Sequence, residues 1–166
     1  MAEGPTYRMP LKRRREGKTD YRQRLRLLKS GKTRAVVRVT NNKIIVQFTD
    51  YHEDGDKVKI NIDSNHLEEY GWDGHGSNLP CSYLVGYLAG KKAQKEGIEE
   101  AVLDIGLNVP KKGGKIFSAL NGIVDSGVYI PHDPEILPTE PRKKGEHINE
   151  EIVGNFNQVK EKLEAL

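Results

Sequence analysis

The sequence lacks two features that define large classes of proteins. Its 166 residues contain a single cysteine, Cys81. One cysteine excludes an internal disulfide and a cysteine zinc cluster, and it favours a reducing compartment. No apolar run approaches the roughly 20 residues that span a bilayer. The basic N-terminus is not followed by an apolar segment, so we do not interpret it as a secretory signal.

Charge is distributed unevenly along the chain. The whole sequence carries 27 Lys and Arg against 24 Asp and Glu, a net charge of +3. Residues 1–34 hold 12 of the basic residues and 3 acidic ones, a net charge of +9, which leaves −6 for the remainder. A basic segment on a mildly acidic body indicates a polyanionic partner that binds through this segment.

The basic segment has its own helical pattern. Residues 1–18 cannot bury enough apolar surface to fold alone, so we expect a partner to order them. Thr19 or Asp20 is placed to cap a helix through YRQRLRLLKS, with Gly31 as its stop. The apolar strip of this helix, Leu25 and Leu28, is too narrow for ordinary packing, which leaves its arginines free for another use.

The composition of this segment favours nucleic acid as the partner. Arginine pairs with phosphate, and aromatic rings such as those of Tyr7 and Tyr21 stack on unpaired bases. A solvated charge run and a membrane-surface helix are the alternatives. A solvated charge run would leave the mutual repulsion of 12 cations unbalanced. A membrane-surface helix would need Trp or Phe, and this segment contains neither. No helix-turn-helix or zinc finger is visible, which favours folded RNA over DNA.

Strands are predicted next. RAVVRVT and KIIVQFT flank an Asn-Asn turn and predict a hairpin, in which every second residue is apolar: Ala35, Val37 and Val39, then Ile44, Val46 and Phe48. A third strand, KVKINID, is expected to place Val58, Ile60 and Ile62 on one face. Ser64 is expected to cap a short helix through HLEEYG.

Helices and short strands alternate in the second half. We predict a helix over 79–97, a buried parallel strand in AVLDIGL, a helix in IFSALNGIVDSG and a last strand in VYIPH. A C-terminal amphipathic helix follows a Pro-rich connector. This order predicts one α/β domain with a mixed sheet covered by helices. We place the arm at residues 1–32, the core at 33–131, and the connector and C-terminal helix at 132–166.

Few residues are arranged for catalysis. The five histidines lack the spacing of a metal motif, and Cys81 is interpreted as a buried side chain rather than a nucleophile. Asp104 ends a buried strand, where a catalytic carboxylate could lie, but it has no identifiable partner and a structural role is favoured. The loop NVPKKGGK precedes a helix, as phosphate-binding loops do, yet Lys115 is followed by Ile116 and the P-loop pattern fails. A nucleic-acid backbone and a solvated turn both fit this loop.

Several blocks carry a family resemblance. These are RRREGKTDYRQRLRLLKSGK, RVTNNKIIVQ, HLEEYGW, LVGYLAGKKAQKEGIEEAVLDIGL, KIFSALNGIVDSGVYIPH and the closing GEHI, and they are distributed along nearly the whole chain. They resemble the archaeal form of ribosomal large-subunit protein eighteen, which is protein five in eukaryotes. The resemblance implies a three-layer α/β core and a cytoplasmic protein of the large ribosomal subunit. It implies binding to 5S rRNA, large-subunit rRNA and neighbouring ribosomal proteins in the central protuberance.

The same resemblance implies no catalytic activity and no cofactor. We also expect no metal, no membrane and no small-molecule substrate. The alternative is a small α/β enzyme acting on phosphate esters or nucleic acid, with Asp104 and the NVPKKGGK loop at its site. The C-terminal helix has two candidate partners, the body of the same chain or a neighbouring ribosomal protein. The RNA-binding residues that the resemblance implies are Arg13, Arg14, Arg15, Lys18, Thr19, Tyr21, Arg22, Arg24, Lys32, Arg34, Arg38, Asn41, Asn42, Lys111, Lys112 and Lys115.

Overall fold

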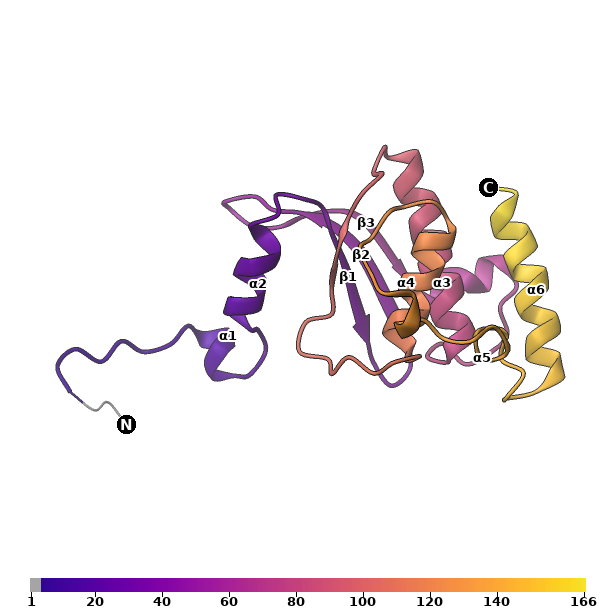
Figure 1. The fold of residues 1–166 in the computed structure, drawn as a ribbon, viewed down its shortest axis with the longest axis horizontal. Helices are drawn as coiled ribbons and strands as arrows, with labels where there is room; N and C mark the ends of the chain where they lie inside the picture. The colour runs from indigo at the N-terminus through magenta and orange to yellow at the C-terminus, as the bar shows by residue number, and fades with distance from the viewer. Residues whose placement is uncertain (1–3) are drawn as a thin grey trace.

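The computed structural model describes residues 4–166 and places a four-stranded mixed sheet at the centre of the molecule. Helices α3 and α4 cover one face of the sheet, and α6 packs on α3 from outside (Figure 1). The arm helices α1 and α2 lie on the side away from α6. The predicted α/β fold class is therefore confirmed.

The elements have the following bounds. In chain order they are α1 (Lys12–Arg15), α2 (Tyr21–Leu28), β1 (Arg34–Val39), β2 (Ile44–Asp50), β3 (Lys57–Asp63), η1 (Ser64–Tyr70), α3 (Leu79–Lys95), β4 (Val102–Asp104), α4 (Lys115–Asp125), η2 (Pro134–Ile136), α5 (Glu140–Lys144) and α6 (Glu150–Glu164).

The strands lie in the order β3-β2-β1-β4. β1 and β2 form the predicted antiparallel hairpin, with Val37 opposite Val46. β4 pairs in parallel with β1, with Leu103 opposite Ala35, so the predicted parallel strand is also confirmed. The connection from β1 to β4 passes through α3, as a parallel crossover requires. This register places the three residues of β4 beside the first three residues of β1, with Arg34 opposite Val102 and Val36 opposite Asp104.

The predicted common face of Val58, Ile60 and Ile62 is wrong. Val58 pairs with Thr49 and Ile60 pairs with Phe48, so one extra residue of β3 lies between two consecutive pairs. Such a bulge changes the face on which the following side chains lie. Val58 is therefore half exposed, whereas Ile60 and Ile62 are buried.

The predicted cap of the next helix is displaced by one residue. η1 is a 3₁₀ helix, and Asp63 caps it by accepting a hydrogen bond of 3.2 Å from the backbone of Asn65. The hydroxyl of Ser64 instead accepts a hydrogen bond of 2.9 Å from the backbone of Ile44. Ser64 thus joins η1 to the start of β2 and is not available as a cap.

The predicted last strand VYIPH does not form. Tyr129 makes one isolated parallel bridge with Glu100. Its carbonyl accepts from the backbone of Ala101 at 3.0 Å, and its amide donates to Glu99 at 2.9 Å. The chain then turns away into the connector, so the segment contributes two hydrogen bonds and no further pairing.

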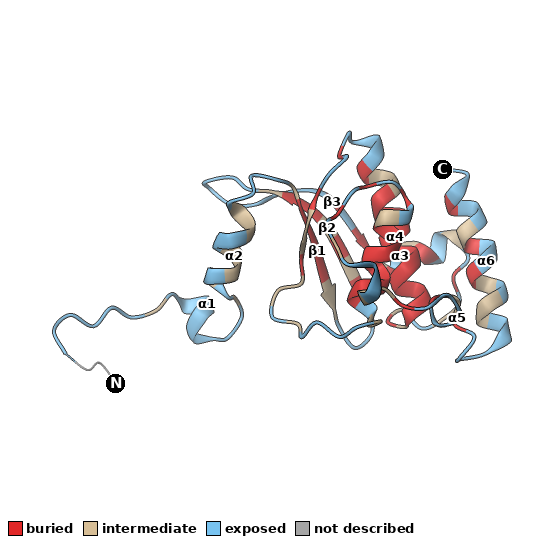
Figure 2. Ribbon diagram, in the orientation of Figure 1, coloured by how far each residue is buried: buried red, intermediate tan, exposed pale blue. Residues whose placement is uncertain are grey.

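Helices α3 and α4 cross in backbone contact. A Cβ atom on Gly86 would lie 2.1 Å from the carbonyl oxygen of Ala119, and one on Gly122 would lie 2.1 Å from that of Tyr83. Only glycine fits at both positions, because any side chain would force the helices apart. This close crossing makes α3 and α4 the rigid layer behind the sheet. Figure 2 shows that the buried residues concentrate in these helices and the sheet.

The C-terminal helix belongs to the core. The side chains of Phe156, Val159 and Leu163 are buried in the main hydrophobic cluster. The ring of Phe156 lies 5.5 Å from that of Tyr83, between centroids. Of the two candidate partners, the body of the same chain therefore covers the apolar stripe of α6. Among residues 4–166, no helix has the length and apolar character needed to cross a membrane.

Candidate nucleic-acid interface

The arm helix α2 is coated with charge and buries no residue. Asp20 caps it, as predicted, by accepting hydrogen bonds from the backbones of Arg22 and Gln23 at 2.9 and 3.2 Å. Leu25 is 58% exposed. The helix α1 also buries no residue, and it consists of four basic residues. The arm therefore forms local structure without an apolar contact layer.

A chain of ion pairs joins the arm to the sheet. Nη2 of Arg24 donates to both carboxylate oxygens of Asp56, at 2.8 and 2.9 Å. Asp56 also pairs with Arg34, whose other amino group lies 3.0 Å from Asp104. Asp104 in turn accepts from Arg38 at 2.9 Å. Alternating charges thus connect α2, the β2–β3 loop, β1 and β4.

The charges of Arg24 and Asp56 are fixed at neutral pH. Burial raises the pKa of the Asp56 carboxyl, but hydrogen bonds from Arg24 and Arg34 outweigh it, and the pKa lies below its usual value. The hydrogen bond to Asp56 raises the pKa of Arg24. Each of these two groups favours the charged form of the other, so Arg24 and Asp56 are both ionised under physiological conditions.

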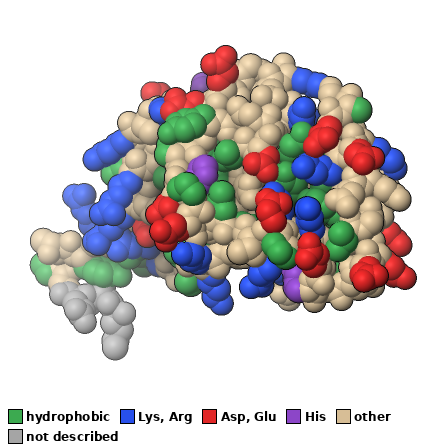
Figure 3. All heavy atoms as spheres, turned by 45° about the vertical axis from the view of Figure 1, so that its right-hand side comes forward, with side chains coloured by type: hydrophobic (Ala, Val, Ile, Leu, Met, Phe, Trp, Pro, Cys, Tyr) green, Lys and Arg blue, Asp and Glu red, His purple; other side chains and the backbone are tan. Residues whose placement is uncertain are grey.

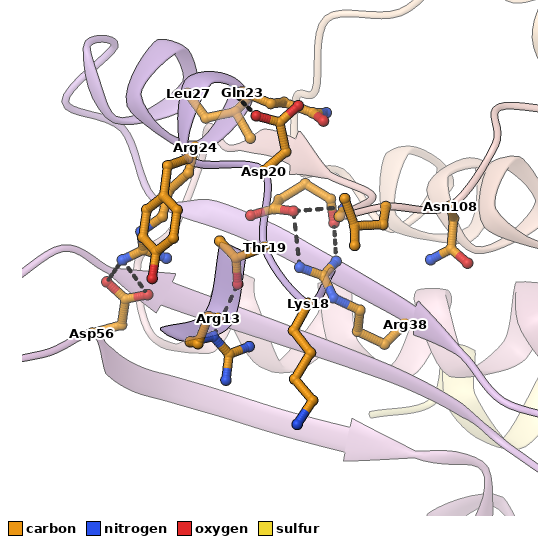
Figure 4. A pocket seen from close by; sticks show the side chains of 14 residues that line it. Arg13, Lys18, Thr19, Asp20, Gln23, Arg24, Leu27, Arg38, Asp56 and Asn108 are labelled. Atoms are coloured by element: carbon orange, nitrogen blue, oxygen red, sulfur yellow. Dashed lines mark hydrogen bonds and ion pairs between the residues drawn. The ribbon is translucent and has the colours of Figure 1, made fainter. Parts of the chain in front are cut away.

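A cleft of about 700 Å³ opens between the arm and the body. Figure 4 shows Arg24 and Asp56 on one side of it, and Arg38 and Asn108 on the other. Nε of Arg13 donates to the hydroxyl of Thr19 at 2.9 Å, which ties α1 to the start of α2. The lining residues are Arg13, Lys18, Thr19, Asp20, Tyr21, Gln23, Arg24, Leu27, Arg38, Asp56, Asp104, Gly106, Leu107 and Asn108.

A second hollow adjoins this cleft. It shares Thr19, Asp20, Tyr21 and Leu107 with the first and adds Arg14, Gly17 and Arg22. Leu107 is 54% exposed at the boundary. Figure 3 shows basic side chains gathered at the arm, whereas the visible part of the body carries both signs. The two hollows combine cations with an aromatic and an apolar side chain, the mixture that suits phosphate and unpaired bases.

The cleft brings together six of the sixteen RNA-binding residues that the resemblance implies, and two more line the adjoining hollow. The loop that begins at Gly106 continues to exposed Lys111 and Lys112, and Lys115 opens α4. Nζ of Lys115 lies 3.2 Å from the hydroxyl of Ser77, and Lys112 pairs with Glu135 at the same distance. These lysines lie on the β4–α4 loop and do not line either hollow.

The remaining implied residues are dispersed. Arg15 lies exposed at the end of α1, and Lys32 is exposed and pairs with Glu100. Asn41 and Asn42 are exposed at the turn between β1 and β2. Asn42 lines a separate polar hollow beside η1. The structure therefore describes one concentrated site on the arm and scattered residues around the body.

Arg34 requires a correction. Its side chain is 2% exposed and its guanidinium lies between Asp56 and Asp104. A buried guanidinium held by two carboxylates cannot reach phosphate, because a buried charge that loses its partners is strongly destabilising. Arg34 supports the interface from below and is not part of its surface.

Two carboxylates were not foreseen as part of the interface. Asp56 and Asp104 organise the arginines, although a negative residue is not expected at a site for RNA. Their partners lie far away in sequence: Arg24 and Asp56 are 32 positions apart, and Arg34 and Asp104 are 70 positions apart. Asn108 and Leu107 also line the cleft without a local motif. Only the acidic character of the β2–β3 loop was visible in the sequence.

The alternative chemistry has no support in this geometry. Asp104 is held by two arginines, as the structural interpretation predicted. Cys81 is fully buried, and burial raises the pKa of its thiol to about 11, so the nucleophilic thiolate is scarce. Within residues 4–166, no cluster of three potential metal ligands occurs.

The sequence profile of the family described as ribosomal large subunit proteins 60S L5 and 50S L18 matches residues 5–99 and 93–133. The chain belongs to this family. The match includes the arm, the sheet, α3 and α4, so the arm is part of the family sequence. The predicted resemblance is confirmed.

Several archaeal relatives share the name large ribosomal subunit protein uL18. The protein of Korarchaeum cryptofilum is 53% identical over 148 residues, which are 89% of this chain and 76% of the relative. That of Haloquadratum walsbyi is 51% identical over 148 residues, 89% and 72% of the two chains. That of Methanothermobacter thermautotrophicus is 50% identical over 150 residues, 90% and 78%.

Family membership decides between the two predicted functions. This chain is a large-subunit ribosomal protein of the archaeal type, a structural component of the cytoplasmic ribosome. The alternative of a phosphate-ester or nucleic-acid-processing enzyme was wrong, because the family is structural and not enzymatic.

Proposed function

We propose that this protein binds 5S rRNA and attaches it to large-subunit rRNA in the central protuberance. One observation carries the proposal: the basic arm and the body form the two sides of a single cleft. A ligand in this cleft contacts both parts at once. The family resemblance supplies the identity of the RNA, and the cleft explains how a protein with a net charge of only +3 binds it.

The mechanism is electrostatic and conformational. Cations from the arm, including Arg13 and Lys18, neutralise phosphates and release condensed counterions. The half-buried ring of Tyr21 offers a stacking surface for an unpaired base. The ion pair between Arg24 and Asp56 holds this surface against the body, and the close crossing of α3 and α4 supports the sheet from behind. The net negative charge of residues 35–166 disfavours non-specific RNA binding on the acidic parts of the body.

The second RNA contact in this proposal lies on the body. Exposed Lys111 and Lys112 precede Gly114, the N-cap of α4, which has no side-chain cap. Free backbone amides at a helix start bind phosphate together with neighbouring lysines. We assign this loop and the Asn41-Asn42 turn to a second RNA surface. Two surfaces on one rigid body allow the protein to join two RNA molecules.

Competition binding tests the proposal. Labelled 5S rRNA is bound to the protein at 0.2 M salt and competed with unlabelled 5S rRNA, a tRNA and duplex DNA. We expect 5S rRNA to compete at least about tenfold better than the others, since specific contacts add to the salt-dependent background. Equal competition by all three would remove 5S rRNA as the specific ligand, while leaving family membership intact.

A further inference from the structure

An acidic residue holds the arm on the body. Among residues 4–31, the pair between Arg24 and Asp56 is the only hydrogen bond or ion pair that reaches beyond Lys32 in the described chain. The arm helices bury no side chain, so apolar packing does not fix their orientation. The position of α2 relative to the sheet therefore depends on Asp56, a residue with the same charge as the proposed ligand.

Asp56 is itself held in place by a buried arginine. It pairs with Arg34, which is 2% exposed and shares its other amino group with Asp104. Asp104 is held in turn by Arg38 and by the backbone amide of Gly106, at 2.9 Å in each case. The buried Nε of Arg34 already has no hydrogen-bond partner. If Asp56 swung away, Arg34 would lose one of its two carboxylates, which is costly for a buried charge.

The contact leaves Arg24 able to bind phosphate. Only Nη2 of Arg24 engages Asp56. Nε and Nη1 make no hydrogen bond within residues 4–166. A guanidinium has five donor hydrogens in a fixed plane, so one edge can hold a carboxylate while another donates to phosphate. Figure 4 shows Arg24 and Asp56 facing each other at the edge of the cleft.

We propose that Asp56 is a positioning residue that orients the arm helix α2 for RNA binding before the RNA arrives. The proposal rests on the proposed function, since it concerns the same RNA interface. Orienting a segment in advance reduces the ordering cost at the moment of binding, and this reduction appears as affinity. The alternative role, a placeholder that RNA phosphate displaces from Arg24, is opposed by the attachment of Asp56 to the buried Arg34.

The two roles predict opposite signs for one substitution. Asp56→Asn removes a negative charge from an RNA surface, and simple electrostatics or a placeholder role then gives tighter binding. Positioning gives weaker binding to 5S rRNA, by about three- to tenfold, because α2 must be ordered by the RNA itself. The measurement is the dissociation constant at fixed salt concentration, together with its dependence on salt.

The same loop offers a matched control. The side chain of Asp54 is 94% exposed, and its described partner is His52 at 3.5 Å. Asp54→Asn removes the same charge two residues away and leaves the arm contact intact. We expect 5S rRNA binding of this variant to be unchanged or slightly tighter. Binding by Asp56→Asn that equals or exceeds that of Asp54→Asn would overturn the positioning role.

Arm order in the free protein supplies a second readout. Amide exchange over residues 21–28 should speed up in Asp56→Asn and stay unchanged in Asp54→Asn. Thermal melting of Asp56→Asn shows whether loss of the Arg34 contact unfolds the body. If it does, Arg24→Gln releases α2 and keeps the Arg34 pairs. Unchanged exchange in Arg24→Gln would then reject the proposal.

Failure of the proposed function remains distinguishable. If wild-type protein shows no preference for 5S rRNA, the RNA assignment fails, whatever the variants do. If wild-type protein prefers 5S rRNA and Asp56→Asn binds it as tightly as Asp54→Asn, the assignment stands and positioning by Asp56 fails.

Discussion

Helices α2 and α6 lie near opposite ends of the chain, and each carries a short apolar strip beside many charges. In α6 the strip of Phe156, Val159 and Leu163 is buried in the core. In α2 no residue is buried, and Leu25 is largely exposed. One helix is held by apolar contacts, and the other by an ion pair between Arg24 and Asp56.

The difference follows from the width of the apolar strip and the charge around it. α6 places apolar residues at 152, 156, 159 and 163, a full stripe over three turns, with acidic residues on its outer face. α2 has two turns and three arginines. A stripe of this width stabilises docking by burial, whereas a short arginine-rich helix gains too little from burial to offset its ordering. The molecule thus separates a helix that stabilises the body, α6, from one that leaves its charged side chains unburied, α2.

Removal of the arm should give the largest effect. We expect deletion of residues 1–32 to weaken 5S rRNA binding by at least about a hundredfold at 0.1 M salt, because most of the phosphate contacts are lost. The body should keep a cooperative thermal transition, since α1 and α2 bury no side chain. Circular dichroism and gel shift on the truncated chain measure both. A truncated chain without a cooperative transition would place the arm in the core.

Truncation of one aromatic side chain tests whether apolar burial holds the C-terminal helix α6. Phe156→Ala should lower the free energy of unfolding by about 3–5 kcal/mol, because it removes a buried ring beside Tyr83. Leu25→Ala is the matched control on the arm and should change it by less than about 0.5 kcal/mol. Denaturant unfolding of both variants gives the comparison. Similar losses for the two would mean that α2 packs apolar surface as α6 does.

Sequence periodicity predicted the elements whose stabilising contacts are local or regular. The hairpin of β1 and β2, helix α3 and the parallel strand β4 follow from alternation and spacing. Prediction failed for Val58 because a bulge adds one residue, and a count of two per repeat cannot detect it. It failed for the cap at Ser64 because that hydroxyl bonds to Ile44 of another strand.

The sequence predicted which segment forms the candidate interface, but not which residues pair with one another there. Charge density identified the arm, since twelve cations in 34 residues need no fold to be recognised. The ion pairs of Asp56 and Asp104 join residues that only the folded sheet brings together. The family resemblance placed Arg34 on the RNA surface, whereas its burial places it beneath that surface. The sequence shows that Arg34 is basic, but it does not show that the side chain is buried.

The smallest expected effect is that of acidification, which should loosen α2 and leave α6 in place. The pKa of Asp56 lies below its usual value. Its ion pair therefore stabilises arm docking fully at every pH above the pKa of an ordinary aspartate. This stabilisation is lost as the pH falls through the lowered pKa. A partly exposed pair contributes about 1 kcal/mol or less, so the arm loosens without unfolding the body.

Relaxation measurements on backbone amides check this expectation. Between pH 7 and about pH 5 the order of α2 should be constant, since aspartates ionise near 3.9 in unfolded chains. Below about pH 3.5 the amides of Tyr21–Leu28 should become more mobile, whereas those around Phe156 stay ordered as long as the body remains folded. The Asp56→Asn variant should show a mobile α2 at every pH. If α2 in that variant still became more mobile on acidification, a carboxylate other than Asp56 would hold the arm.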